Sequence, residues 1–231
     1  MHAHRHPFFL GLLITLLAGP ATAGRPFATE DAGVLAGGEC EFEAYTAHAS
    51  ARGAASESAW WLQPGCGLGP VAGRDLQLGL GAGRSRADGR SATGVALGGK
   101  WALSAGGDDA PQWALAFGTA AVQSDGRWQH DGHGASLVLT LPGGGGAWHA
   151  NLGHARGGGA SATTWALARE QALIEGLDGG VELYGDDHGA PWAGGGLRWA
   201  ATERLTLDAS AAWQADGQRA RTLSLGMKIA W

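Results

Sequence analysis

The last ten residues, Thr222-Leu223-Ser224-Leu225-Gly226-Met227-Lys228-Ile229-Ala230-Trp231, decide the fold of this chain. Apolar side chains occupy every second position, and small or polar side chains fill the positions between them. Because successive side chains of a β-strand point to opposite faces, the segment predicts a strand with one apolar and one polar face. This strand ends on an aromatic residue, whereas the termini of soluble domains usually fray into solvent.

The ending resembles the C-terminal signature of bacterial outer-membrane β-barrels, a final amphipathic strand that closes on Phe or Trp. The resemblance implies that the barrel-assembly machinery recognises the strand ending at Trp231, and that outer-membrane lipid surrounds the protein. The alternative is an ordinary strand of a soluble β-sandwich that happens to come last.

Composition narrows the class of protein. The 231 residues are enough for one sizeable all-β domain, and 45% of them are apolar, as in ordinary globular proteins. The net charge of −5 comes without a basic block, which argues against a nucleic-acid partner. No apolar run of about 18 residues follows residue 23, so the sequence predicts no membrane-spanning helix.

The first 23 residues have the organisation of a secretory signal peptide. Arg5 and nearby histidines precede the apolar run Phe8–Ala18, and Ala21-Thr22-Ala23 fits a small-residue cleavage site. The apolar run is too short to span a bilayer, so we expect export and cleavage after Ala23 rather than a retained anchor. Residues 24–38 have no periodicity and are interpreted as an N-terminal plug segment at or in a lumen, with a flexible tail as the alternative.

The region 39–231 alternates throughout, with turn signals every 15 to 20 residues or so. This pattern predicts twelve strands, at residues 39–48, 57–66, 75–83, 91–103, 112–121, 134–141, 147–156, 163–171, 177–186, 191–200, 205–213 and 221–231. An even number of strands of about 9–11 residues suits a tilted crossing of a bilayer. We therefore predict an all-β fold, an antiparallel up-and-down transmembrane β-barrel of about twelve strands.

The predicted turns between strands indicate which residues of neighbouring strands pair. Gly143-Gly144 suits a type I′ hairpin, which predicts Leu139 opposite Trp148, Leu137 opposite Ala150 and Ser136 opposite Asn151. The stretches 123–132 and 186–189 are interpreted as longer polar links.

One face of the predicted strands collects polar side chains. They are expected to line a lumen: Glu41, Glu43, Gln63, Asp75, Gln77, Lys100, Ser136, His149, Asn151, Glu170, Asp178, Glu182, Arg198, Asp208 and Lys228. A sandwich would also alternate, but here eight or more strands do so with no compensating apolar plug. Tryptophans near strand ends favour interfacial girdles: Trp60, Trp61, Trp101, Trp113, Trp148, Trp165, Trp199, Trp213 and Trp231.

Acidic residues outnumber basic ones on this polar face. Charges that line a wet lumen tune selectivity, so the excess predicts a mild preference for cations if the lumen is open. The alternative is that these charges pair across the barrel, or with Arg25, and plug it.

Cys40 and Cys66 are the two cysteines of an exported chain. A hairpin centred on Gly53 would place them directly opposite each other, at a Cα–Cα distance of about 4.5–5.5 Å, which a disulfide can bridge. An oxidising compartment favours that bond, with two buried free thiols as the alternative.

The N-terminal third is similar to the bacterial outer-membrane proteins grouped as "putative MetA-pathway of phenol degradation". Four stretches and the strand with Lys100 carry the similarity: Pro26–Gly33, Cys40–Glu43, Trp61–Cys66 and Asp75–Gly81. Glu30 stands where that family more often has Asp, and Gly65 where it often has Ala. The resemblance implies a barrel or channel for small, often hydrophobic, solutes, and neither a substrate nor a site residue carries over from it.

The sequence gives little support for a catalytic site or a metal site. Ser136, His149 and Asn151 share a face of adjacent strands, as in a lipid-directed hydrolase, but the predicted register sets Ser136 opposite Asn151 and His149 opposite Val138. His130-Asp131-Gly132-His133 lacks a fourth ligand and is interpreted as a solvated loop. We therefore expect no catalytic residue, no metal and no cofactor.

These patterns together predict a Gram-negative outer-membrane protein. The expected function is passive passage of small, hydrophobic or aromatic, solutes, and the sequence does not identify the solute. The alternatives are a non-conducting structural or interaction barrel and, less favoured, a lipid-directed hydrolase.

Overall fold

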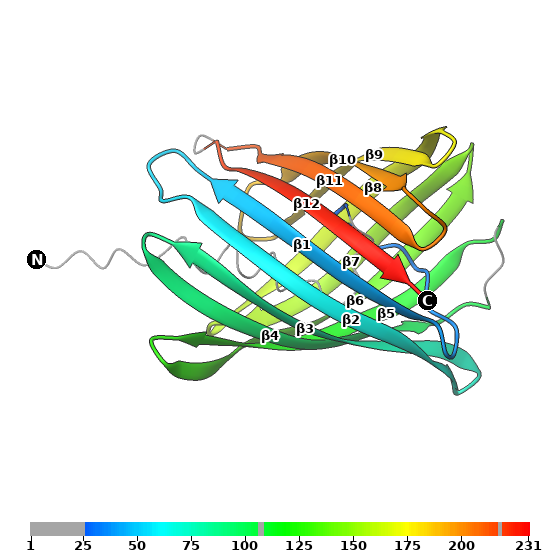
Figure 1. Cartoon of the computed structure of the whole chain (residues 1–231), viewed down its shortest axis with the longest axis horizontal. Coiled ribbons are helices and arrows are strands. Elements are labelled where there is room, and N and C mark those ends of the chain that lie inside the picture. Colours follow the sequence, from blue (N-terminus) through cyan, green and yellow to red (C-terminus); the bar gives the residue numbers. More distant parts are fainter. Residues whose placement is uncertain (1–25, 106–108, 217–218) are drawn as a thin grey trace, which may run out of the picture.

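The computed structural model describes residues 26–105, 109–216 and 219–231, so the predicted signal peptide and Arg25 lie outside the described residues. Twelve strands of this part of the chain close into an antiparallel barrel, in which each pairs with its neighbours in sequence and β1 pairs with β12 (Figure 1). Their bounds are β1 Cys40–Ser50, β2 Glu57–Val71, β3 Arg74–Ala87, β4 Arg90–Ala102, β5 Gln112–Ser124, β6 Arg127–Gly143, β7 Gly146–Gly157, β8 Ala160–Ile174, β9 Leu177–Asp186, β10 Trp192–Ala200, β11 Leu205–Gln214 and β12 Arg221–Ala230. The predicted all-β barrel is confirmed.

The two ends of the barrel are distinguished by the chain termini. Strand β1 begins and β12 ends at one end, on the right in Figure 1, which we call the C-terminal rim. The hairpins β1–β2, β3–β4, β5–β6, β7–β8, β9–β10 and β11–β12 turn at the other end, which we call the opposite rim.

Several hairpins have two-residue turns with left-handed backbone at both positions. The φ angles are 49° and 74° at Asp88-Gly89, 50° and 77° at Asp125-Gly126, and 63° and 76° at Gly144-Gly145. Positive φ at both positions is the type I′ geometry that matches the twist of a hairpin, and it favours Gly and Asp.

Two of the predicted connections are wrong. The β6–β7 turn is Gly144-Gly145 rather than Gly143-Gly144, so Leu139 faces Ala150 and Ser136 faces Gly153. A shift of two positions keeps every side chain on its predicted face, which is why alternation did not detect it. Residues 123–132 are not a loop, because β5 and β6 continue to the turn at Asp125-Gly126, past an irregularity between Ala120 and Ala121.

Apolar side chains cover the outside of the wall. Leu80, Leu152 and Leu225 are 61–62% exposed, while their neighbours Gly79, Gly153 and Gly226 face the interior. An apolar outer face in a closed barrel contradicts the sandwich alternative, in which these leucines would be buried between sheets. The described residues include no helix long and apolar enough to cross a membrane.

Tryptophans lie on the outer face, with one exception among the predicted girdle. Trp60, Trp148 and Trp213 are 48–56% exposed, whereas Trp61 points into the barrel and lies against Gly81 and Gly83. The prediction for Trp61 is wrong because it follows Trp60 directly, and adjacent strand residues point to opposite faces.

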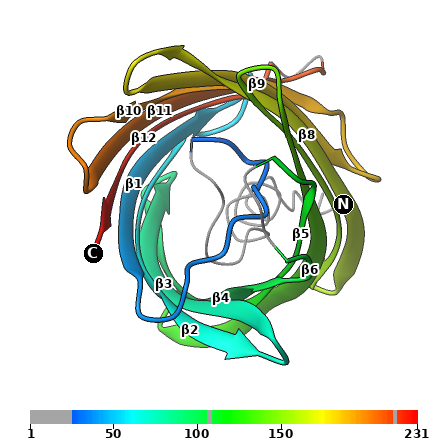
Figure 2. The ribbon, with the colours of Figure 1, turned by 90° about the vertical axis from the view of Figure 1, so that its right-hand side faces the viewer.

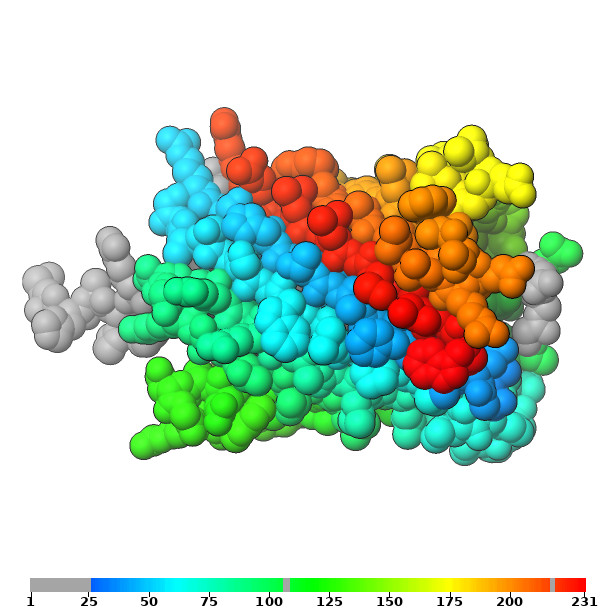
Figure 3. Space-filling model, viewed as in Figure 1, coloured from blue at the N-terminus to red at the C-terminus, as the bar shows by residue number. Residues whose placement is uncertain are grey.

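The closing seam joins the first and last strands. The register pairs Phe42 with Ile229 and Glu43 with Lys228, and the backbones of Cys40 and Trp231 exchange two hydrogen bonds of 3.0 Å. Figure 3 shows β12 as a red band running between β11 and β1 to the C-terminal rim.

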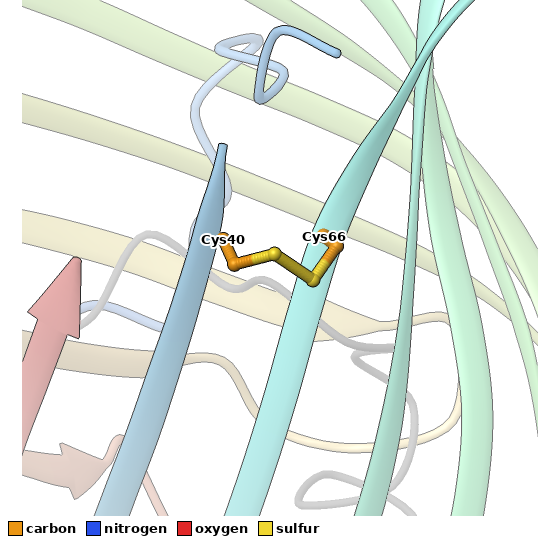
Figure 4. Close-up of a disulfide and its surroundings, with 2 residues drawn as sticks. All are labelled: Cys40 and Cys66. Atoms are coloured by element: carbon orange, nitrogen blue, oxygen red, sulfur yellow. A yellow bond between two sulfur atoms is a disulfide. The ribbon is translucent and has the colours of Figure 1, made fainter. Parts of the chain in front are cut away.

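The predicted disulfide between Cys40 and Cys66 is confirmed, so neither thiol is free (Figure 4). The two residues are direct partners in the β1–β2 register, with Cα atoms 4.1 Å apart. The bond crosses the outer face near the C-terminal rim, where β1 begins.

Candidate functional site

The inner wall of the barrel carries the polar side chains of the sequence. The register aligns Glu43 with Gln63, Gln77 with Lys100, and Arg198 with both Asp178 and Asp208. The same register places the remaining predicted lumen residues on this face: Glu41, Asp75, Ser136, His149, Asn151, Glu170, Glu182 and Lys228.

Residues 26–38, which we call the N-terminal segment, lie inside the barrel. Figure 2 looks along the barrel from the C-terminal rim and shows this segment in blue within the ring of strands. Thr29, Glu30 and Ala32 are 2–5% exposed, so the wall and the segment cover one another.

Inner-wall side chains accept hydrogen bonds from the backbone of the N-terminal segment. The carboxylate of Glu182 on β9 accepts the N–H groups of Ala28 (3.1 Å) and Thr29 (2.9 Å) and the hydroxyl of Thr29 (2.9 Å). Asn151 on β7 accepts the N–H of Glu30 at 2.7 Å and donates to its carbonyl oxygen at 2.9 Å.

Two more strands hold the second half of the N-terminal segment. Thr140 Oγ1 on β6 accepts the N–H of Ala32 at 2.8 Å, and Gln77 Oε1 on β3 accepts the N–H of Leu35 at 2.7 Å. A backbone without regular structure buries unpaired polar groups unless side chains satisfy them, so these acceptors make an irregular segment tolerable inside a barrel.

Glycines of the wall make room for the apolar start of the segment. A Cβ atom at Gly196 would lie 2.7 Å from the Pro26 ring, and one at Gly180 would lie 2.8 Å from the Phe27 ring. Phe27 is 4% exposed. The two glycines of β9 and β10 therefore form a cradle that larger residues would fill.

Lys100 on β4 is the centre of the charge network. Its Nζ donates to the carbonyl oxygen of Asp31 at 2.8 Å and lies 3.6 Å from the Glu30 carboxylate and 3.8 Å from that of Asp31. The Lys100 side chain is 2% exposed. A buried ammonium requires such partners, because its desolvation is otherwise very costly.

Glu30 belongs to the N-terminal segment rather than to a membrane-spanning strand. Burial raises the pKa of its carboxyl to about 7, against the opposing attraction of Lys100. One lysine faces two carboxylates here, so the neutral form of Glu30 relieves the excess negative charge.

The other two cations predicted for the lumen are also paired. Arg198 contacts Glu170 at 2.6 Å, and Lys228 lies 3.5 Å from Glu41. These two pairs join nearby strands of the wall, β10 with β8 and β12 with β1, and the N-terminal segment contributes Glu30 and Asp31 to the pairing at Lys100. Arg25, the predicted alternative partner, lies outside the described residues.

The three residues of the possible hydrolase arrangement, Ser136, His149 and Asn151, contact other groups rather than one another. His149 Nδ1 lies 2.9 Å from Thr140 Oγ1, and Asn151 binds the N-terminal segment. Ser136 faces Gly153, and among the described residues it makes no hydrogen bond to His149. The geometry lacks the nucleophile–base contact that catalysis by Ser136 requires.

His130 and His133 do not form a recognisable metal site. Their rings are 5.5 Å apart on the outer face of β6, and His130 Nε2 lies 3.1 Å from the Thr119 hydroxyl. In the β9–β10 loop, Asp186, Asp187 and His188 lie close together, but Asp186 accepts the N–H of His188 and Asp187 accepts that of Thr163. These carboxylates therefore serve as hydrogen-bond acceptors that hold the conformation of the β9–β10 loop.

Sequence reasoning did not identify Thr140 or the aromatic residues of the inner wall. Tyr184 and Trp192 stack with ring centroids 6.1 Å apart, and Tyr45 pairs with Trp61 in the β1–β2 register. Alternation would have indicated the four aromatics, because each shares a parity with charged inner-wall neighbours in its own strand.

Fold and site define a twelve-stranded β-barrel of the outer-membrane type whose lumen holds its own N-terminal segment. The chain belongs to the family described as "Uncharacterised conserved protein UCP029691", whose sequence model matches residues 12–231. This is not the MetA-pathway family that the N-terminal third resembles. The sequence matches no protein among curated ones.

Solved structures share the fold. The COG4313 outer membrane channel from Pseudomonas putida F1 is 12% identical with a TM-score of 0.62, over 87% of this chain and 98% of that one. The KdgM porin (9% identity) and the NanC porin (10% identity) each give a TM-score of 0.53, over 81% of this chain and 98% of theirs. At these identities the likeness establishes the fold alone.

Proposed function

We propose that this protein is an outer-membrane channel for passive passage of small solutes. The observation that carries the proposal is a charged and hydrogen-bonding inner wall inside a closed barrel with an apolar exterior, the arrangement of water-filled pores. The similar folds named as a channel and as porins support it.

The proposed N-terminal plug segment regulates the opening. Its backbone occupies acceptors from four strands, which would otherwise face water or solute. Residues 26–36 must therefore move, or leave a path beside them, for solute to pass.

For the solute, we propose a small hydrophobic or aromatic compound. The resemblance to the MetA-pathway proteins supports this class, and the stacked Tyr184–Trp192 pair offers an aromatic surface on the inner wall. Uptake and growth on aromatic compounds, with and without the protein, test it.

The proposed cellular route has three parts. A signal peptide cleaved after Ala23 exports the chain, the barrel-assembly machinery reads the strand ending at Trp231, and the barrel resides in the outer membrane of a Gram-negative bacterium. We propose no catalytic role and no cofactor.

A second candidate is a non-conducting structural barrel. It is favoured by the pairing of the three cations predicted for the lumen, Lys100, Arg198 and Lys228, and by the dense hydrogen bonding of the N-terminal segment. In this case the segment is a permanent plug.

Single-channel conductance of the reconstituted protein separates the two candidates. We expect small or intermittent currents from the complete mature chain, and currents several-fold larger from a variant lacking residues 26–36. A disulfide between cysteines introduced at Ala32 and Thr140 should hold the current low, because the Ala32 N–H and the Thr140 hydroxyl oxygen lie 2.8 Å apart in the natural protein. Thr140→Cys alone is the control. Folded but silent protein in both the complete and shortened forms would establish the structural barrel instead.

Ion selectivity is a second readout of the same reconstitution. Asp75 and Asp178 face the lumen near the C-terminal rim without an ion pair among the described residues, which supports a mild preference for cations. A reversal potential measured across a salt gradient should show this preference, and it should weaken in Asp75→Asn with Asp178→Asn.

A further inference from the structure

The strands of the barrel keep acidic side chains off their outer face, although cations lie on both faces. Within the described strands the acidic side chains lie on the inner face, apart from Asp131 at the irregularity of β6, and none lies on the outer face. The outer face does carry cations. Arginines therefore face the membrane side of the wall without an acidic neighbour in the strands.

Most of these outward cations lie near the opposite rim, whereas Arg74 and Arg169 lie near the C-terminal rim. We call Arg84 and Arg86 of β3, His133 of β6, and His154 and Arg156 of β7 the basic band. All five are exposed, and the three arginines form no ion pair with described residues.

The register fixes the depth of the two β3 arginines of the basic band, and Arg86 lies two residues nearer the opposite rim than Arg84. Arg84 is the direct partner of Trp60, and Arg156 is the direct partner of His133. Exposed tryptophans mark the boundary between hydrocarbon and headgroups in membrane proteins, so a cation level with Trp60 or beyond it lies among headgroups.

A contrasting arginine lies near the C-terminal rim. Arg169 also faces outward, but its Nη2 donates to the Gly144 carbonyl at 3.1 Å and its guanidinium lies 5.7 Å from the centre of the Trp148 ring. That arginine is used by the protein itself, whereas the guanidinium groups of the basic band are left to an external partner.

We propose that the basic band binds the phosphate groups of lipid A in the outer leaflet. The planar guanidinium pairs with phosphate through two parallel hydrogen bonds, and two arginines at i and i+2 on one face lie about 7 Å apart along β3. A row of cations without acids attracts anionic headgroups and repels none of them. The inference rests on the proposed outer-membrane placement and adds to it that the opposite rim faces the outside of the cell; it does not rest on the passage of solutes.

Binding of diphosphoryl lipid A to the purified mature barrel in phosphatidylcholine nanodiscs tests the proposal. Native mass spectrometry would count the bound lipid A molecules during a titration. We expect saturable binding to the natural protein, at least tenfold weaker binding to Arg84→Gln/Arg86→Gln/Arg156→Gln, and weak binding of dephosphorylated lipid A.

Two arginines of the same rim provide a matched control. Arg90 and Arg127 are exposed but lie on the inner-face parity, opposite Ala87 and Ser124. Arg90→Gln/Arg127→Gln removes two positive charges from the same rim, against three in the test variant, and should keep lipid A affinity within about twofold. A heat-dependent gel shift confirms that each variant is folded.

Three results would overturn the proposal: equal affinities of the two variants, no preference for the phosphorylated lipid, or equal binding of phosphatidylglycerol. Conductance of the same preparations is measured in parallel. Loss of lipid A preference with intact currents would overturn the lipid site alone, and a silent bilayer with intact lipid A binding would overturn the channel alone.

Discussion

Lys100 is the inner-wall cation that holds the N-terminal segment. Its ammonium group is buried between the strand wall and two carboxylates of the segment, and it also donates to a backbone carbonyl. The inner-face parity of Lys100 was predictable from alternation. Its partners Glu30 and Asp31 were not, because a segment without periodicity gives no indication of where its side chains point.

Replacing Lys100 should release the segment. Lys100→Met leaves Glu30 and Asp31 facing each other without a cation, and loss of one partner of a buried pair costs on the order of 3–5 kcal/mol. Maleimide labelling of a cysteine introduced at Ala32, which is 5% exposed in the docked segment, should become at least tenfold faster. Both native cysteines are disulfide-bonded and do not react.

Lys228→Met is the matched control for that measurement. Lys228 is 37% exposed and 3.5 Å from Glu41, so its pair contributes about 1 kcal/mol or less and does not touch the N-terminal segment. Similar labelling rates in the two variants would contradict the central role of Lys100.

The raised pKa of Glu30 predicts that docking depends on pH. Lys100, Asp31 and Glu43 surround the Glu30 carboxyl, and burial raises its pKa from 4.5 to about 7. The docked state thus holds a proton that the released state gives up, so docking is strongest below about pH 4.5 and weakens as the pH rises through 7. Between pH 5.5 and pH 8, the labelling rate of the cysteine at position 32 should rise by more than the intrinsic rise in thiol reactivity. Glu30→Gln should remove this extra response, and its persistence would assign the effect to another group.

At the scale of elements, alternation predicted the strands well and their connections less well. Each strand needs period-two alternation only where it contacts hydrocarbon, so the polar first part of β6, residues 127–132, has the sequence pattern of a link. The four glycines Gly143–Gly146 offer several equivalent turns, so sequence alone did not choose between registers two residues apart. Thr140 was missed because a threonine in an apolar strand has no distinctive pattern.

The disulfide is an element-scale contribution to stability. It joins β1 to β2 across a sequence separation of 26 residues, and closing such a loop is worth on the order of 3–4 kcal/mol in the chain-entropy model. Cys40→Ser/Cys66→Ser should lower the temperature at which the folded band disappears in a heat-dependent gel shift. Reduction of the natural protein should reproduce the change, and an unaltered transition would show that the barrel alone sets the stability.

At the scale of the whole molecule, the outer face of the barrel and its inner face should tolerate different substitutions, because the first contacts hydrocarbon and the second faces the lumen. Leu225 faces outward and is 62% exposed, while its neighbour Ser224 faces inward and lies 2.7 Å from Ser210. Leu225→Arg should cost about 2–4 kcal/mol at mid-membrane depth, whereas Ser224→Arg points toward the wet side. Folding yield into lipid vesicles should fall for the first variant and change little for the second. The reverse order would mean that the faces are assigned wrongly.

The N-terminal segment is fastened at its base, where the N–H of Gly38 donates to Gly67 at 3.0 Å and the N–H of Gly67 donates to Glu39 at 2.9 Å. A dozen residues extend by at most about 40 Å, so a displaced segment never diffuses away from its barrel. It acts as an intramolecular competitor at an effective concentration on the order of millimolar for any solute that needs the same hydrogen-bond acceptors. A solute that binds those acceptors weakly does not displace the N-terminal segment. The short attachment of the segment therefore sets a threshold of external solute concentration, below which the segment stays in the lumen.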